Sequence, residues 1–468
     1  MIFERLNQFR NNIAFIEKNN TCNYSDIIEY GIKFADKFYT KNILCLIVTG
    51  NNAATIISYL SAVENNIPAL LVNKPKKNTE LLSIINNYKP KYIFLSTQDS
   101  FDENIKNITS KQIYSIFDYS LIETIYDTDY DIHPDLSILL TTSGSTGTNK
   151  YVRLSKKNII SNAQSIIQYL NISENDRVIT TLPFSYSYGL SIINTHILSG
   201  ASIMLSEYSI IQREFWQLLS TTNATTFGGV PYTYEMMQRL KFERMNIPNI
   251  SYITQAGGRL NTNLTQYFLE ECSKKNIQFF KMYGQTEATA RISYLEPKYL
   301  YEKTDSIGKA IPDGELFVVD ENNNYLSSNE TGELIYKGSN VCMGYAESCY
   351  DLHTGDENNG ILHTGDIGYY DKDGFFYITG RKKRFLKVFG NRINLDELEN
   401  KLNINGCLCA CSGVDDKIKI YVCSEDMKNK AALLLKDILD IHPRGYSIEI
   451  IKEIPRNSTG KIQYSLLG

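Results

Sequence analysis

The sequence predicts an α/β fold: a large N-terminal domain of parallel sheets with packed helices, a small β-rich subdomain, and a small α+β C-terminal domain. Short apolar runs alternate with helical patterns between residues 43 and 282, which favours parallel strands joined by crossover helices. From about residue 307 the apolar runs are joined by polar turns, which indicates a β-rich subdomain. The chain has 468 residues, more than one hydrophobic core usually serves, so two or more domains are expected.

Each expected element rests on its local pattern. Short runs rich in Ile, Val, Leu, Phe and Tyr predict strands, and apolar residues three or four positions apart predict helices. Gly228 to Pro231 are expected to form a turn, because glycine and proline interrupt regular structure. The expected strands are 43–48, 69–72, 92–95, 136–140, 178–181, 202–205, 252–254, 279–282, 315–319, 333–337 and 375–379. The expected helices are 53–64, 81–86, 157–170, 189–198, 210–220, 234–241, 261–274 and 394–402.

Composition excludes several classes of protein. A net charge of −4 provides no basic surface for nucleic acid or membranes, and the basic run 381–384 is too short to change this. Nine cysteines contain no C-x-x-C pair, and the alternation of Cys407, Cys409 and Cys411 places them on one face of a strand, away from any metal. With no signal-like start and no membrane-length apolar run, we expect a cytoplasmic protein with reduced thiols.

The most informative segment is 141–150, which combines hydroxyl side chains, two glycines and a lysine directly after an expected strand. Glycine-rich backbone can turn successive N–H groups toward one anion, and hydroxyls add further donors. We interpret the segment as a cradle for a polyphosphate; the alternative is a flexible surface loop. It is not a Walker P-loop, because Gly147 and Lys150 are separated and Tyr151 follows.

Four later sites fit a nucleotide-activating enzyme. In segment 283–287 the tyrosine could stack on a base, while Thr286 and Glu287 could hold Mg²⁺ near phosphates. Asp366, after a tight glycine turn, could accept the two hydroxyls of a ribose, and Arg381 could reach the ribose or a phosphate. Lys461 lies on a glycine-containing turn. Each site alone has an ordinary alternative: a strand–loop junction, a turn aspartate or a solvated cation.

In this order and spacing, the segments resemble the adenylate-forming (AMP-binding) superfamily, whose members include acyl-CoA and acyl-carrier-protein synthetases. The resemblance spans nearly the whole chain; Asn149 and Tyr151 stand where proline and glycine are usual. It implies ATP-dependent activation of a carboxylic acid to an acyl-adenylate with release of pyrophosphate. The acyl group would then pass to a thiol, either of CoA or of carrier-protein phosphopantetheine. ATP and Mg²⁺ are the implied cofactors.

The resemblance also implies a domain division and catalytic roles. An adenylation core would span 1–380, with the β-rich subdomain at about 307–380, and a mobile lid domain would span 384–468 beyond a hinge near Lys383. Lys461 would bridge the substrate carboxylate and the α-phosphate, and Thr142 and Glu287 would hold Mg²⁺. The thioester step would use Phe389 and Gly390. The implied ATP-binding residues are Thr142, Ser143, Gly144, Ser145, Thr146, Gly147, Lys150, Gly258, Tyr283, Gly284, Gln285, Thr286, Asp366 and Arg381.

The segment 182–190 resembles the stretch that lines the acid pocket in this superfamily. Relatives that take α-amino acids place an aspartate there, whereas this chain has serines and tyrosines. A buried ammonium without a partner is costly, so an α-amino acid is the less favoured substrate. The implied pocket residues are Tyr186, Tyr188, Val230, Ala256 and Gly257.

Three alternatives remain beside the acid–thiol ligase. They are a stand-alone amino-acid adenylating enzyme, a catalytically silent nucleotide- or acyl-adenylate-binding relative, and a luciferase-type oxidative enzyme. The presence of Glu287, Asp366 and Lys461 counts against the silent relative. The compact C-terminal domain mildly favours a carrier protein over CoA as the acceptor.

Overall fold

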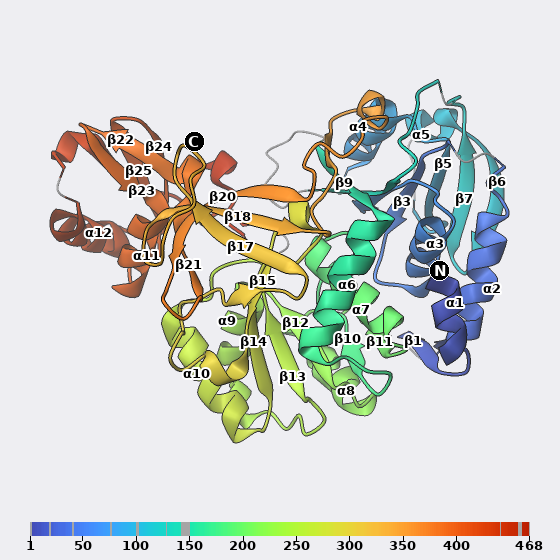
Figure 1. The fold of residues 1–468 in the computed structure, drawn as a ribbon, viewed down its shortest axis with the longest axis horizontal. Coiled ribbons are helices and arrows are strands. Elements are labelled where there is room, and N and C mark those ends of the chain that lie inside the picture. The colour runs from blue at the N-terminus through green and yellow to red at the C-terminus, as the bar shows by residue number, and fades with distance from the viewer. Residues whose placement is uncertain are drawn as a thin grey trace. The chain divides into compact units, whose positions relative to one another are not determined.

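The computed structural model describes residues 2–17, 20–39, 42–74, 77–99, 103–127, 129–141, 150–439, 441–456 and 461–467, and only the backbone of Arg392. Two compact units emerge (Figure 1). The first comprises residues 1–304, 310–315 and 337–362, and the second comprises 305–309, 316–336 and 363–468. The expected hinge at Lys383 falls inside the second unit and stays a prediction.

The first unit contains most of a nine-stranded sheet with the order β16-β15-β14-β13-β12-β10-β11-β1-β2. Neighbours from β14 to β1 run parallel, as the sequence predicts, whereas β15 and β2 pair antiparallel. The carboxyl ends of β12, β13 and β14 therefore lie along one edge. In the sheet order, the strands are Lys309–Ala310, Ser293–Leu295, Gln278–Tyr283, Tyr252–Gln255, Thr226–Gly229, Arg177–Ile179, Ser202–Leu205, Ile13–Glu17 and Asn20–Asn23.

An eight-stranded sheet has the order β19-β9-β8-β4-β3-β5-β7-β6. Its central strands β8, β4, β3 and β5 are parallel, and β8 pairs antiparallel with β9. Strand β9 therefore follows β8 along the chain before the helix expected near Ser155 begins. In the sheet order, the strands are Gly344–Ala346, Tyr151–Ser155, Leu136–Thr141, Ala69–Asn73, Cys45–Thr49, Tyr92–Ser96, Tyr119–Thr124 and Thr109–Ile116.

The helices of the first unit supply much of one core that also takes residues from both sheets. Helices α3 and α7 are buried along almost their whole length, which fits their small and apolar side chains. The described helices are α1 Ile2–Leu6, α2 Tyr24–Ala35, α3 Ala53–Glu64, α4 Asn78–Tyr88, α5 Glu103–Ile108, α6 Lys156–Leu170, α7 Ser187–Leu198, α8 Arg213–Thr221, α9 Pro231–Arg239 and α10 Thr262–Lys274. None of the described helices is long and apolar enough to cross a membrane.

The expected turn at Gly228 to Pro231 is wrong in part. Gly228 and Gly229 end strand β12, and only Val230 separates them from α9, which begins at Pro231. Glycine is needed at 228 because a Cβ atom there would lie 2.8 Å from the Tyr188 hydroxyl. Gly228 therefore serves close packing against α7, and Gly229 close packing against α9, rather than chain reversal.

The second unit holds most of a four-stranded sheet, β17-β18-β20-β21, followed by a hairpin and a three-stranded sheet with two helices. The strands are β17 Gly314–Val319, β18 Gly332–Gly338, β20 Ile361–Tyr370, β21 Phe376–Arg381, β22 Phe385–Val388, β23 Asn391–Asn394, β24 Ala410–Val414, β25 Lys417–Val422 and β26 Tyr446–Ile450. The helices are α11 Leu395–Ile404 and α12 Glu425–Ile438.

Two expectations for this unit need correction. Asp366 lies within strand β20, not after a tight turn, although Gly365 does have a positive φ of 70°. Strand β24 begins at Ala410, so it contains Cys411 but neither Cys407 nor Cys409. The three thiols still share one buried core, and all nine cysteines of the chain are free.

Candidate active site

The predicted acid-pocket residues come together at the carboxyl ends of β12 and β13. Tyr186, Tyr188, Val230 and Ala256 belong to one apolar cluster. The hydroxyl of Tyr188 donates to the carbonyl oxygen of Thr254 at 2.8 Å. Gly257 has a φ of 82°, and a Cβ atom there would lie 2.6 Å from the Tyr186 hydroxyl. The pocket role of these residues stays a prediction.

Burial also sets the chemistry of these tyrosines. It raises the pKa of Tyr186 to about 12, against a smaller opposing effect of Arg291. Burial likewise raises the pKa of Tyr188 above its usual value. Both hydroxyls therefore stay protonated near neutral pH and can donate hydrogen bonds.

Sequence analysis missed Arg291, which lies against this cluster. Its guanidinium carbon is 3.9 Å from the ring centroid of Tyr188, and its Nε donates to the sulfur of Met282 at 3.3 Å. The residue is only 3 % exposed. Among the described residues, no carboxylate lies within ion-pair distance of it. Burial of a cation costs several kcal/mol, whereas a desolvated cation–π contact returns about 2 kcal/mol.

A second group joins the end of the proposed phosphate loop to Glu287. The ammonium of Lys150 lies 4.1 Å from the ring centroid of Tyr345 and 3.6 Å from the carboxylate of Glu347. The hydroxyl of Tyr345 donates to Glu287 at 2.9 Å. Burial, and next the charge of Glu287, raise the pKa of Tyr345, so this hydroxyl remains a donor.

Strand pairing explains how these distant residues meet. Tyr345 lies in β19, which pairs with β9 directly after Lys150. The backbone N–H of Cys342 donates to the carbonyl oxygen of Glu287 at 2.8 Å. Tyr345 was missed because β19 has only three residues and its partner strand is far away in sequence.

The segment after β14 is held in one conformation. Gln285 Nε2 donates to the Tyr283 hydroxyl at 3.1 Å, and the Thr286 and Ser187 hydroxyl oxygens are 3.1 Å apart. Gly284 is packed against the backbone of Ala290, where any Cβ atom would clash. Gly258 packs against Pro231, the first residue of α9.

The donor set at Glu287 fits Mg²⁺, which proteins usually hold through one or two carboxylates together with substrate phosphates. Thr142, the other proposed ligand, lies outside the described residues, as do Ser143, Gly144, Ser145, Thr146 and Gly147. Within the described ranges, no cluster of three or more His, Cys, Asp or Glu could hold a metal by itself.

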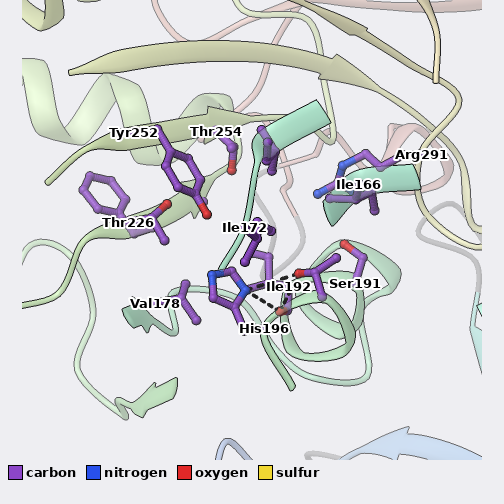
Figure 2. A pocket seen from close by; sticks show the side chains of 14 residues that line it. Ile166, Ile172, Val178, Ser191, Ile192, His196, Thr226, Tyr252, Thr254 and Arg291 are labelled. Carbon is purple, nitrogen blue, oxygen red and sulfur yellow. Dashed lines mark hydrogen bonds between the residues drawn. The ribbon is translucent and has the colours of Figure 1, made fainter. Parts of the chain in front are cut away.

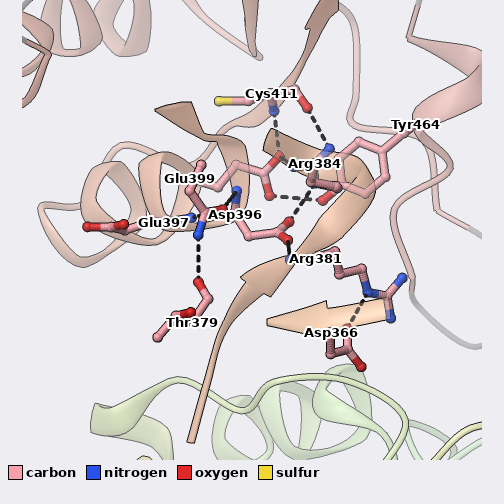
Figure 3. Close-up of polar contacts among 10 residues, drawn as sticks. Asp366, Thr379, Arg381, Arg384, Asp396, Glu397, Glu399, Cys411 and Tyr464 are labelled. Atoms are coloured by element: carbon pink, nitrogen blue, oxygen red, sulfur yellow. Dashed lines mark hydrogen bonds and ion pairs between the residues drawn. The ribbon is translucent and has the colours of Figure 1, made fainter. Parts of the chain in front are cut away.

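In the second unit, the antiparallel pairing of β20 and β21 places Asp366 opposite Arg381 (Figure 3). The Asp366 carboxylate forms an ion pair with Arg381 Nε at 3.2 Å. The Asp366 side chain is 4 % exposed and that of Arg381 is 63 % exposed. One charged pair therefore combines a fixed acceptor with a cation that reaches solvent.

The remaining predicted residues lie nearby in the same unit. Lys383 is exposed in a short 3₁₀ turn, Lys382–Arg384. Phe389 and Gly390 form the turn between β22 and β23, with φ values of 50° and 87°. Lys461 is half-buried and directly precedes Ile462, which forms a bridge with Arg456.

Figure 3 also shows a network that sequence analysis missed. Arg384 pairs with Asp396 at 2.5 Å and with Glu399 at 2.6 Å. Its guanidinium lies 3.9 Å from the ring centroid of Tyr464, whose hydroxyl donates to Glu399 at 2.9 Å. The network fastens the C-terminal tail to α11.

Comparison with known proteins identifies the family. A family model described as AMP-binding enzyme matches residues 2–346, so the chain belongs to the AMP-binding enzyme family. The 2-succinylbenzoate–CoA ligase of Oceanobacillus iheyensis is 28 % identical over 426 residues, covering 88 % of this chain and 84 % of the relative. The Listeria innocua ligase of the same name is 24 % identical and covers 99 % of this chain and 97 % of its own length.

Solved structures share the fold. The o-succinylbenzoate CoA synthetase of Bacillus subtilis, in complex with ATP and magnesium, has a TM-score of 0.80 at 21 % identity and covers 100 % of this chain and 98 % of its own. An anthranilate CoA ligase in complex with anthranoyl-AMP has a TM-score of 0.77 at 19 % identity, with coverage of 100 % and 96 %. The expected fold class and the expected enzyme class, an AMP-forming acid–thiol ligase, are therefore confirmed.

Proposed function

We propose that the protein activates a small carboxylic acid with ATP, releases pyrophosphate and transfers the acyl group to CoA. The observation that carries this proposal is the contact of Tyr345 with both Lys150 and Glu287. It joins a cation at the end of a hydroxyl-rich loop to a carboxylate suited to Mg²⁺, as polyphosphate binding requires. The first acid to test is 2-succinylbenzoate, because the relatives above are named for it.

The first half-reaction joins two anions, so its barrier is largely electrostatic. Lys150 and the loop of segment 142–147 would hold the β- and γ-phosphates. Glu287 and Thr142 would hold Mg²⁺, which supplies charge neutralisation at the phosphates. Lys461 would neutralise charge that develops between the acid carboxylate and the α-phosphate.

The nucleoside has its own proposed contacts. The adenine would be lined by Tyr283, Gly284 and Gln285, together with Gly258. Asp366 would accept the ribose hydroxyls, because its buried carboxylate is fixed by the strand pairing, and Arg381 beside it would reach ribose or phosphate.

For the second half-reaction, the hairpin turn of Phe389 and Gly390 would serve thioester formation, with a hinge at Lys383. The relatives named above are CoA ligases, which favours CoA over the carrier protein that the compact C-terminal domain suggested. The pocket cluster also argues against an amino-acid substrate, since the charged side chain packed against it is the cation of Arg291.

The test is ATP–pyrophosphate exchange against a panel of carboxylic acids, followed by thioester detection with CoA or a phosphopantetheine-bearing carrier. We expect acid-dependent exchange, and a thioester with CoA alone. Absence of exchange with every acid, although ATP binds, would contradict the proposal. A thioester formed only on the carrier would overturn the choice of CoA.

A further inference from the structure

The positive charge of Arg291 is not balanced by an anion from the described part of the chain. Its guanidinium is always charged at neutral pH and is almost fully buried. It contacts an aromatic face, a thioether sulfur and the hydroxyl of Tyr169, none of which carries a negative charge. A buried cation with only such partners is an unusual and costly arrangement.

Beside Arg291 lies a small cavity of about 20 Å³, lined in part by α6 and α7 (Figure 2). Its lining includes His196, Tyr252 and Thr254 but no Asp or Glu. The Nε2 of His196 and the hydroxyl of Tyr252 are buried there without a hydrogen-bond partner. The polar groups on this side of Arg291 thus leave its charge uncompensated, and the cavity has room for about one water molecule.

Arg291 also borders the predicted acid pocket. Tyr188 is common to both, because its ring packs on the guanidinium and also belongs to the pocket cluster. Tyr186 and Met282 complete this part of the cluster. A ligand that enters the cluster therefore brings its inner end close to Arg291.

We infer that Arg291 binds a second carboxylate of the acid, so that the substrate is a dicarboxylic acid activated at only one end. This inference rests on the proposed function and names its substrate class. The buried position of Arg291 suits the far end of the acid, since the carboxylate that reacts must remain accessible to ATP. Arginine fits the task because its planar fork pairs with both oxygens of a carboxylate.

The same arrangement would exclude monocarboxylic acids. An acid of the same shape without the second carboxylate would fill the pocket and leave the guanidinium desolvated and unpaired. Sites that bury a polar partner reject analogues that lack its counterpart far more strongly than they reject a change of size.

The test uses matched acids that differ by one carboxylate: 2-succinylbenzoate with 3-benzoylpropanoate, phthalate with benzoate, and glutarate with butyrate. Exchange kinetics and calorimetric binding are measured for the wild type, Arg291→Gln and Arg291→Lys. We expect the wild type to prefer one diacid over its partner by about a hundredfold or more in kcat/KM. In Arg291→Gln the preference should fall below about tenfold, mainly through KM, and Arg291→Lys should retain part of it.

Arg177→Gln is the control, because Arg177 is a half-buried arginine of strand β10 that hydrogen-bonds to the backbone of Thr222. It should leave the preference unchanged, whatever it does to the melting temperature. Equal use or equal binding of both members of every pair by the wild type would overturn the inference while leaving acid activation intact. So would an equal loss for both members in Arg291→Gln, which marks a structural residue. If no acid supports exchange, the proposed function fails, and calorimetry still decides whether diacids bind through Arg291.

Discussion

Single buried residues set how this protein responds to pH. His196 in α7 is 3 % exposed, and its Nδ1 is 2.8 Å from the carbonyl oxygen of Ile192. Burial lowers the pKa of His196 from its usual 6.5 to about 4. The folded protein therefore keeps this imidazole neutral at pH values where the unfolded chain takes up a proton.

The sign of the effect follows from proton linkage. Stability from His196 is complete above about pH 6.5 and is lost as the pH falls toward about 4. At pH 5 the loss is about 2 kcal/mol. We expect His196→Gln to show a flatter dependence of the unfolding free energy between pH 7 and pH 5 than the wild type.

The measurement is urea unfolding at both pH values, followed by the fluorescence of Trp216, the single tryptophan of the chain, which lies in the first unit. His353→Gln, at an exposed histidine, is the control and should retain the wild-type slope. An identical slope in His196→Gln and the wild type would show that another group governs acid sensitivity.

At the scale of elements, the β22–β23 hairpin has a turn built from two residues with positive φ. This backbone is typical of a tight two-residue hairpin turn. At position 390 only glycine adopts it without strain. A Cβ atom at Gly390 would meet nothing within 4 Å, so a substitution there strains the backbone without a clash.

We therefore expect Gly390→Ala to cost about 1 kcal/mol of hairpin stability and to slow thioester formation while pyrophosphate release stays near normal. Both half-reactions are measured separately, the first by exchange and the second by single-turnover transfer to CoA. Gly406→Ala imposes similar strain, with a φ of 71°, outside the hairpin, and should leave both rates unchanged. An equal loss of both rates in Gly390→Ala would contradict the assignment.

Elements with strong local patterns were predictable. The helix expected at 53–64 matches α3, and the strand expected at 202–205 matches β11, because an apolar run with clear end signals decides both. Strands β9 and β19 were not predicted, since Tyr151–Ser155 and Gly344–Ala346 are stabilised mainly by pairing with distant partners. Register between remote strands is a tertiary property that no local window contains.

At the scale of the whole molecule, the assigned residues come from both units. The sequence singled out Glu287, Asp366 and Lys461 because their motifs are local. It passed over Arg291 and Tyr345, because a lone arginine or tyrosine gains meaning only when its burial and its partners are known. Arg384 was considered only as part of the short basic run 381–384, yet its side chain is 13 % exposed and doubly paired.

Lys461 belongs to the second unit, and its substitution tests whether that unit contributes to acid activation. We expect Lys461→Ala to lower acyl-adenylate formation by about 10²–10³-fold, because one cation opposite developing charge is lost. Acid-dependent pyrophosphate release measures the effect, and circular dichroism checks the fold. Lys452→Ala, at an exposed lysine upstream, is the matched control. Near-normal release by Lys461→Ala would refute the catalytic role.

The contact between Arg384 and Tyr464 limits how far Lys461 can move. Only about 11 Å of fully extended backbone joins Lys461 to Tyr464. While Tyr464 stays stacked on Arg384, this short stretch of backbone tethers Lys461 to Arg384, the residue directly after Lys383. Any larger displacement of the Lys461 ammonium therefore requires Arg384 and the start of α11 to move with it.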